Sequence, residues 1–140
     1  MTDALPLPED FWPLARTSPF ADLIGPIHQK AGADGLILGV RAESKHCNVR
    51  GHVHGGMLAT LADIAMGYST AFSTQPPTAL VTVNLSIDYA GKAALGDWIE
   101  VHTDIHKVGR SLAFANCHLL VGSTRIARAS AVFSIPESRQ

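Results

Sequence analysis

The sequence is poor in the residues that define several large protein classes. It contains two cysteines, Cys47 and Cys117, in 140 residues. These are too few for a disulfide framework and are not spaced as a metal-binding pair. Eleven Lys and Arg residues stand against twelve Asp and Glu, for a formal net charge of −1, so there is no basic excess of the kind a nucleic-acid partner requires. A disulfide-rich scaffold is excluded and a nucleic-acid partner is disfavoured.

Long uncharged hydrophobic runs are also absent. No run approaches the ~18 residues that a membrane-spanning helix needs. The first ten residues are acidic and interrupted by proline, which is unlike a secretory signal peptide. We therefore expect a cytoplasmic protein with no membrane partner.

Apolar residues are plentiful, at 46% against 16% charged. A chain of this length is expected to fold as one domain with a real core. The low charged fraction indicates that other copies of the chain cover part of the surface. With no repeat, linker or low-complexity segment, we predict a domain over residues 18–136. The lead-in over residues 1–17 must still dock its apolar side chains somewhere.

Local signals predict two helices. A short one follows Ser18, with proline at its first position, and ends at Gly25–Pro26. A long apolar one runs from about Gly55 to Phe72.

Five strands are predicted, at residues 35–43, 81–89, 98–108, 111–121 and 124–135. In residues 81–89 every odd position is apolar and every even one polar, which is typical of a half-buried antiparallel strand. Turns are expected at Gly109–Arg110 and Gly122–Ser123. The last four strands are predicted to form an antiparallel meander that curls about the long helix, an α+β arrangement. An open sheet edge favours dimerisation.

The start of the long helix carries the strongest functional signal. His54-Gly55-Gly56 leaves unhindered backbone N–H groups where a helix begins, suited to an anion or carbonyl. Asp63 follows two turns later among apolar residues, and a buried charge is costly without a function or a partner. A carbonyl-polarising end and an acid on one element favour acyl chemistry.

The faces of this helix differ in composition. The stripe expected to pack on the sheet is Leu58, Leu61, Ala65, Tyr68 and Phe72. Asp63 shares its face with Ala59, Thr60, Met66 and Gly67, which are mostly small. Small residues permit close approach, so we expect Asp63 to face a seam between two copies of the chain.

Asn48, His54-Gly55-Gly56 and Asp63, in this order of elements, resemble the hotdog-fold acyl-CoA thioesterases of the phenylacetate-pathway (PaaI-like) family. The similarity covers almost all of residues 18–135 and extends to Thr82, Tyr89 and the segment 107–114. It implies an α+β hotdog fold, with a curved antiparallel sheet wrapped around a long central helix. It also implies a homodimer as the minimal active unit, usually paired again into a homotetramer.

The resemblance implies the following catalytic roles. The Gly55 N–H polarises the thioester carbonyl, and Asp63 of the partner subunit is general base or nucleophile. Asn48 helps to place substrate or water, while Thr82 hydrogen-bonds Asp63 or the attacking water. His54 braces the loop.

For substrate binding, the resemblance implies that Lys107 and Arg110 contact the phosphates of coenzyme A. The remaining substrate-binding candidates are Gly56, Gly109 and Ser111. No metal is expected, and no cofactor apart from the coenzyme A of the substrate. Thr82 stands where some relatives carry Ser, and His52 has no assigned role.

The predicted function is hydrolysis of acyl-CoA to free acid and CoA. The helix dipole and a free N–H stabilise charge on the carbonyl oxygen, and a desolvated carboxylate is a stronger base than one in water. The acyl group, aryl or medium to long chain, is left open, with Val81, Val83, Met57, Met66 and Tyr68 as candidate tunnel residues.

Alternative readings remain. The chain could bind acyl-CoA without turnover, or act as a hotdog hydratase or dehydratase. Cys117 is expected in the core and Cys47 in a loop.

Overall fold

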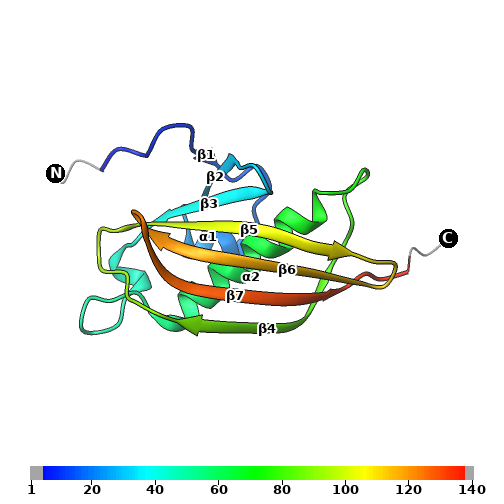
Figure 1. The fold of residues 1–140 in the computed structure, drawn as a ribbon. Coiled ribbons are helices and arrows are strands. Elements are labelled where there is room, and N and C mark those ends of the chain that lie inside the picture. The colour runs from blue at the N-terminus through cyan, green and yellow to red at the C-terminus, as the bar shows by residue number, and fades with distance from the viewer. Residues whose placement is uncertain (1–4, 138–140) are drawn as a thin grey trace.

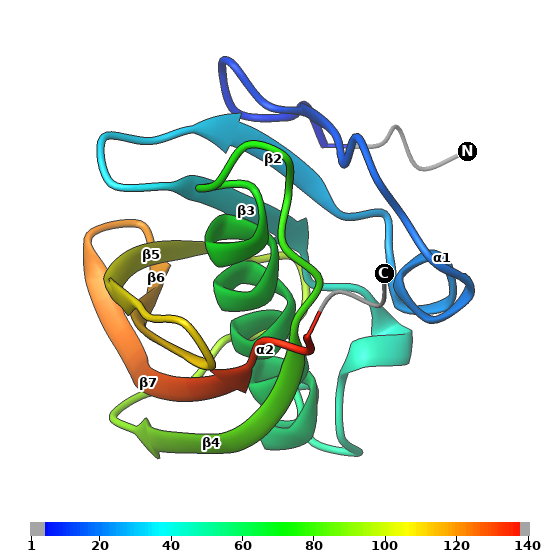
Figure 2. The same ribbon diagram turned by 90° about the vertical axis from the view of Figure 1, so that its right-hand side faces the viewer.

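A curved sheet wraps around one long helix in the computed structural model, which describes residues 5–137 (Figure 1). The helices are α1 (Pro19–Ile24), the 3-10 turn η1 (Ser44–His46) and α2 (Gly55–Ala71). The strands are β1 (Trp12–Pro13), β2 (His28–Ala31), β3 (Leu36–Arg41), β4 (Val81–Tyr89), β5 (Trp98–Val108), β6 (Leu112–Val121) and β7 (Thr124–Ser134). Viewed from the end, α2 lies in the hollow of the sheet (Figure 2).

The predicted helices are found where local signals placed them. Ser18 caps α1, its Oγ accepting the N–H of Ala21 at 3.1 Å, and proline occupies the first turn. Helix α2 begins at Gly55, as predicted, and Phe72 is its C-terminal cap. No helix within residues 5–137 is long and apolar enough to cross a membrane.

All seven strands pair antiparallel, in the order β1-β2-β3-β5-β6-β7-β4. The predicted meander is therefore wrong in one respect, because β4 pairs with β7 and not with β5. Alternation shows that a strand is half-buried but says nothing about its neighbour. Placing β4 beyond β7 carries the sheet around the far side of α2 (Figure 2).

The sequence did not predict β1 and β2. Strand β2 pairs with β3, and β1 pairs with β2. Both are short, and β2 (HQKA) has no alternating apolar pattern that could have indicated it. The boundary predicted at residue 17 stays a prediction.

The described part of the lead-in, residues 5–17, docks on this added edge of the sheet. Phe11 is buried, with its ring centroid 5.0 Å from that of Trp98 in an edge-on arrangement. Gly39 makes room for this packing, because a Cβ there would lie 2.1 Å from Trp98. Leu14 packs on the core, whereas Trp12 is largely exposed.

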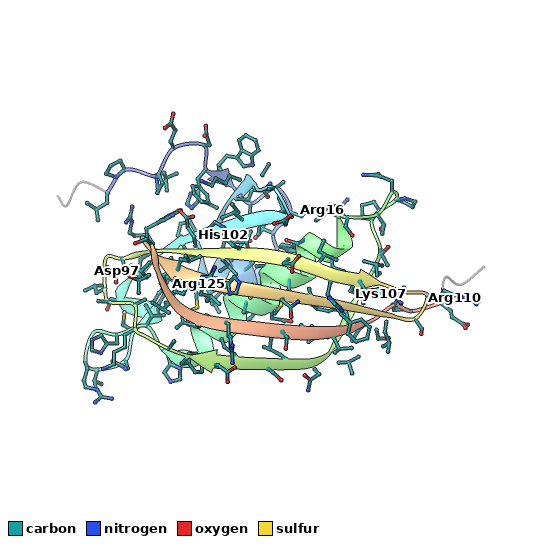
Figure 3. All side chains as sticks on the ribbon, viewed as in Figure 1. Arg16, Asp97, His102, Lys107, Arg110 and Arg125 are labelled. Atoms are coloured by element: carbon teal, nitrogen blue, oxygen red, sulfur yellow. The ribbon has the colours of Figure 1, made fainter. Side chains whose placement is uncertain are left out.

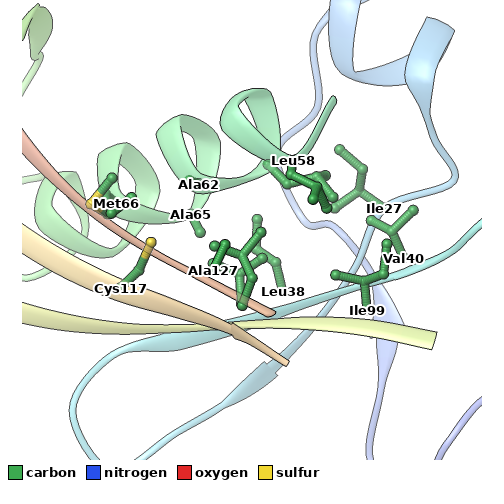
Figure 4. Close-up of a cluster of buried hydrophobic side chains, with 14 of the residues drawn as sticks. Ile27, Leu38, Val40, Leu58, Ala62, Ala65, Met66, Ile99, Cys117 and Ala127 are labelled. Atoms are coloured by element: carbon green, nitrogen blue, oxygen red, sulfur yellow. The ribbon is translucent and has the colours of Figure 1, made fainter. Parts of the chain in front are cut away.

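The core lies between α2 and the concave face of the sheet (Figure 4). That face is rich in alanine, which lets the sheet approach the helix closely: Ala113, Ala115, Ala127, Ala129 and Ala131 are all buried. Cys117 is buried among them as predicted, and burial raises the pKa of its thiol to about 12.

Two helix positions depart from the predicted stripe. Met66, assigned to the face of Asp63, is completely buried in the core. Phe72, assigned to the buried stripe, is 37% exposed. The reason is geometric: the sheet wraps more than one face of α2 along its middle and covers its C-terminal end less.

Candidate functional site

Asp63 lies half-buried on α2 and is hydrogen-bonded to β4. The hydroxyl of Thr82 donates to Asp63 Oδ1 at 2.8 Å. This contact was expected from the family resemblance. It fixes the orientation of the carboxylate by engaging one of its two oxygens.

A bulge in β4 turns Thr82 towards the helix. Thr82 is opposite Phe133 of β7 and Asn84 is opposite Val132, so Val83 has no partner of its own. Strict alternation would have put Thr82 on the outer face with Asn84. The extra residue moves Thr82 to the concave face, opposite the buried Phe133, since a bulge re-aims the side chains around it.

The five candidate tunnel residues do not line one cleft within the described residues. Val81 and Val83 are 58% and 60% exposed and Met66 lies in the core. Of the five candidate tunnel residues, Tyr68 lines a cleft beside Asp63. Met57 is partly buried against the core.

We call this hollow the acid cleft. Its volume is about 420 Å³. It is lined by Arg16, Asp63, Ile64, Gly67, Tyr68, Ala71, Phe72, Pro77, Thr78, Ala79, Leu80, Thr82 and Phe133. The lining is mostly apolar, with the Asp63 carboxylate set in it.

The start of α2 offers one free backbone donor. His54 caps the helix, its Nδ1 accepting the N–H of Gly56 at 3.0 Å. The His54 carbonyl accepts the N–H groups of Met57 and Leu58, the two residues that follow Gly56. Within residues 5–137 the Gly55 N–H has no acceptor, whereas the Gly56 N–H is occupied by the cap.

Tyr89, at the end of β4, holds this helix start in place. Its hydroxyl donates to the Gly55 carbonyl at 2.6 Å, and a Cβ added to Gly55 would lie 3.3 Å from its ring. The sequence marked Tyr89 as part of the resemblance but gave it no role.

Asn48 shapes the loop before the helix. Its Oδ1 accepts the N–H groups of Arg50 at 2.9 Å and His52 at 3.2 Å, which is typical of a turn-forming asparagine. The acceptor is therefore committed to the loop, and the Nδ2 amino group remains as a donor.

Asn48 and Gly55 line a second hollow, which we call the amide cleft, of about 440 Å³. It is lined by Asn48, Arg50, His52, Val53, Gly55, Leu58, Tyr89, Ala90, Gly91 and Lys92. The lining contains Arg50 and Lys92 and no acid, so its charge is positive. These two cations were not singled out from the sequence, because each stands alone in a polar loop.

His46, assigned from the sequence to a polar loop, is buried and links neighbouring segments by hydrogen bonds. Its Nδ1 accepts the Glu43 N–H at 3.0 Å, so the Nε2 carries the proton and donates to the Ile24 carbonyl at 2.5 Å. The His46 carbonyl accepts the N–H of His54 at 2.9 Å. The 3-10 turn thereby ties α1 to the start of α2.

The structure brings Asp63 together with Thr82, and Gly55 together with Asn48, but keeps the two pairs apart. Asp63 comes eight residues after Gly55, which is about 12 Å along a helix axis. Neither cleft contains both residues. A single carbonyl cannot contact the acid and the Gly55 N–H of the same chain.

The predicted coenzyme A contacts lie at the β5–β6 turn, where Lys107 and Arg110 extend from the end of the sheet (Figure 3). Gly109 and Ser111 stabilise the turn, with the Gly109 N–H donating to Leu112 and the Ser111 carbonyl accepting from Ile135, both at 2.8 Å. None of the four lines the acid cleft or the amide cleft.

The histidines form no metal cluster in the part of the chain that the structure describes: no three His, Cys, Asp or Glu side chains there are placed to share an ion. His102 instead pairs with Glu100 at 2.9 Å on the outer face of the sheet. Burial, chiefly, and the nearby Arg125 lower the pKa of His118 on the neighbouring strand.

Comparison with known families gives a match to the thioesterase superfamily over residues 50–132. The proposed esterase PA0474 of Pseudomonas aeruginosa is 47% identical over 131 residues, covering 93% of this chain and 98% of that protein. Human acyl-coenzyme A thioesterase 13 is 32% identical over 101 residues, which is 71% of each chain.

Two solved structures extend this likeness. Zebra fish thioesterase superfamily member 2 superposes with a TM-score of 0.78 at 28% identity, covering 85% of this chain and 88% of that one. The Escherichia coli PaaI protein superposes with a TM-score of 0.77 at 18% identity, covering 86% of both chains. The latter shows the fold alone. Together they confirm the predicted α+β hotdog fold.

Proposed function

This chain belongs to the thioesterase superfamily and is a thioester hydrolase, and we propose that its substrates are acyl-CoA thioesters. The observation that carries the proposal is that the chain presents both an Asp63 carboxylate oriented by Thr82 and, in a separate cleft, a Gly55 N–H with no acceptor among the described residues. The relatives named as acyl-coenzyme A thioesterases support coenzyme A as the thiol.

The active unit we propose is a homodimer formed through β4. This strand pairs only with β7 within the described residues, so its other edge is free for a second copy. Thr82 stands near one end of β4 and Tyr89 at the other, each bonded to α2. Antiparallel pairing of two β4 strands exchanges these ends. The acid cleft of one copy then faces the amide cleft of the other.

The mechanism follows from that juxtaposition. The Gly55 N–H of one subunit donates to the thioester carbonyl, and the helix dipole stabilises the negative charge that develops there. Asp63 of the partner subunit takes a proton from water as the water attacks the carbonyl carbon. Collapse of the tetrahedral intermediate breaks the carbon–sulfur bond, and the proton held by Asp63 passes to the departing sulfur, which releases coenzyme A and the free acid and restores the carboxylate.

Asp63 can alternatively attack the carbonyl itself and form an anhydride, which water then opens. Thr82 engages one carboxylate oxygen, and the other is available either as base towards water or as nucleophile. After a single turnover in ¹⁸O-labelled water, label in Asp63 would establish the anhydride route with water attacking the Asp63 carbon, because general-base catalysis places label in the product acid alone.

The polar end of the substrate is proposed to meet positive charge. Arg50 and Lys92 line the amide cleft, and Lys107 and Arg110 lie at the exposed end of the sheet. In the antiparallel dimer the amide cleft of one subunit adjoins the β5–β6 turn of the other, which suits the phosphates of coenzyme A.

We propose no cofactor beyond coenzyme A. We also propose a homotetramer built from two dimers and a cytoplasmic location, with which the two free cysteines are consistent.

Thiol release from a panel of acyl-CoAs tests the proposal. Asp63→Asn should lower kcat/KM by roughly a hundredfold to ten-thousandfold, which is the usual contribution of a positioned acid or base. Asp104→Asn, an exposed acid on β5, is the matched control and should leave the rate unchanged. Binding of acyl-CoA without thiol release from any substrate would instead indicate a binding module or a hydratase.

A further inference from the structure

The acid cleft ends at a cation from the lead-in segment. Arg16 lies near the C-terminal end of α2 (Figure 3), with its guanidinium carbon 5.6 Å from the centroid of the Phe72 ring. Among the lining residues that the structure describes, Asp63 and Arg16 are the only charged ones. They mark the two ends of an otherwise uncharged cleft.

The cleft runs along one side of α2 between these charges. Gly67, Tyr68 and Ala71 lie on that side between Asp63 and Phe72. Asp63 and Phe72 are nine residues apart, or about 14 Å along the helix. An acyl group whose carbonyl is near Asp63 can therefore extend past the Tyr68 ring towards the guanidinium.

The lead-in is anchored on both sides of Arg16. The Leu14 N–H donates to the Ile27 carbonyl at 3.0 Å, and the Ala15 N–H donates to Gln29 Oε1 at 2.9 Å. The Thr17 hydroxyl donates to Asp22 Oδ1 at 2.5 Å. These contacts hold the backbone of the segment across the end of α2 and so place the exposed Arg16 side chain at the wall of the acid cleft.

The charge of Arg16 is not neutralised by the protein around it. The part of the chain that the structure describes contains two ion pairs, His102–Glu100 and Arg128–Asp88, and neither involves Arg16. The aromatic face of Phe72 is its main partner, which leaves the guanidinium donors available. A guanidinium binds a carboxylate through two parallel hydrogen bonds.

We propose that this enzyme prefers acyl-CoA substrates whose acyl group ends in a carboxylate, with Arg16 binding that distal carboxylate. The inference rests on the proposed function, because it takes the acid cleft as the acyl site. It assigns a role to the lead-in segment, which carries the specificity-determining residue while α2 and β4 carry the chemistry.

The test compares matched substrates that differ only at the distal end: hexanoyl- with adipoyl-CoA, octanoyl- with suberoyl-CoA and decanoyl- with sebacoyl-CoA. We expect the carboxylate-ended member to have the higher kcat/KM at the chain length that spans the cleft. Arg16→Met, which keeps the apolar stem, should lower the ratio within that pair roughly tenfold to a hundredfold. Arg125→Met, an exposed arginine at the β6–β7 turn, is the control and should keep the wild-type ratio.

A purely structural role of Arg16, at the C-terminal end of α2, would change thermal stability and leave the substrate ratio as it was, which overturns the proposal. So does a wild-type preference for the methyl-ended member at every length. If Arg16→Met does not fold, Arg16→Lys serves, because it keeps the charge but not the paired hydrogen bonds, and its ratio should be intermediate. If none of the six substrates releases thiol while other acyl-CoAs do, the carboxylate preference is overturned and the proposed function stands; no thiol release from any acyl-CoA would contradict the proposed function itself.

Discussion

The Thr82 hydroxyl and the Asp63 carboxylate are joined by a 2.8 Å hydrogen bond between β4 and α2. The contact exists because Val83 is an extra residue in β4, and this bulge points the Thr82 side chain towards α2. A local irregularity in an edge strand thus sets the orientation of the proposed catalytic acid.

Removal of this hydrogen bond should impair turnover. Thr82→Val keeps the shape of the side chain and loses the hydroxyl, so we expect kcat to fall roughly tenfold to a hundredfold, the range for a hydrogen bond to a charged group. Thr82→Ser keeps the hydroxyl and should stay within about threefold of wild type. Steady-state thiol release measures both, and equal rates for the two variants would show that the hydroxyl is not needed.

The Gly55 N–H can be deleted with little change to the helix. Proline is well tolerated at the first helical position, which Gly55 occupies, and it has no N–H. Gly55→Pro should therefore lower kcat by about a hundredfold or more, the usual cost of a lost oxyanion donor. Gly55→Ala keeps the N–H and adds the same Cβ beside Tyr89. It should remain clearly more active, and a similar loss in both variants would implicate crowding instead.

A site shared between subunits should be restored by mixing two inactive variants. In a heterodimer of Asp63→Asn with Gly55→Pro, one of the two sites receives an intact Asp63 and an intact Gly55. We expect about half of the wild-type activity per dimer, because a symmetric dimer has two equivalent sites. Co-expression with two different affinity tags isolates the mixed species. If a single chain formed the whole site, that species would be as inactive as its parents.

His28 should make stability depend on pH. It lies partly buried on β2, its ring centroid is 5.9 Å from that of Trp98, and its Nδ1 is buried without a hydrogen-bond partner. Burial lowers the pKa of His28 from 6.5. The unfolded chain then takes up a proton at higher pH than the folded one, so stability is lost as the pH falls below about 6.5.

Urea unfolding at about pH 7.5 and about pH 5.5 measures this dependence. His28→Phe keeps a ring beside Trp98 and should make the unfolding midpoint fall less over that interval. Part of the fall should remain, because burial also lowers the pKa of His118. His106 is exposed, and His106→Phe is the control, whose urea midpoint should fall as much as that of wild type. If the urea midpoint of His28→Phe fell as much as that of wild type between the two pH values, His28 would not be a source of the pH dependence.

Features with a local physical cause were the ones the sequence revealed. Ser18 and the proline after it fixed the start of α1, and His54-Gly55-Gly56 fixed the start of α2, since caps act within one turn. The last four strands were recognised by alternation and turn residues. Asp63 and Gly55 stood out because glycine at a helix start and an acid among apolar residues are both unusual.

Tertiary structure decided the rest. The pairing of β4 with β7, the burial of Met66 and the inward turn of Thr82 depend on contacts between distant segments, which no local pattern encodes. Strand β2 forms because β3 offers it hydrogen-bonding partners, and Arg16 reaches the acid cleft because β2 and α1 anchor the lead-in. The sequence alone thus determined which residues are the catalytic candidates and which element carries them. Their separation into two clefts, one acidic and one with a free amide, follows from the length of α2 and the curl of the sheet.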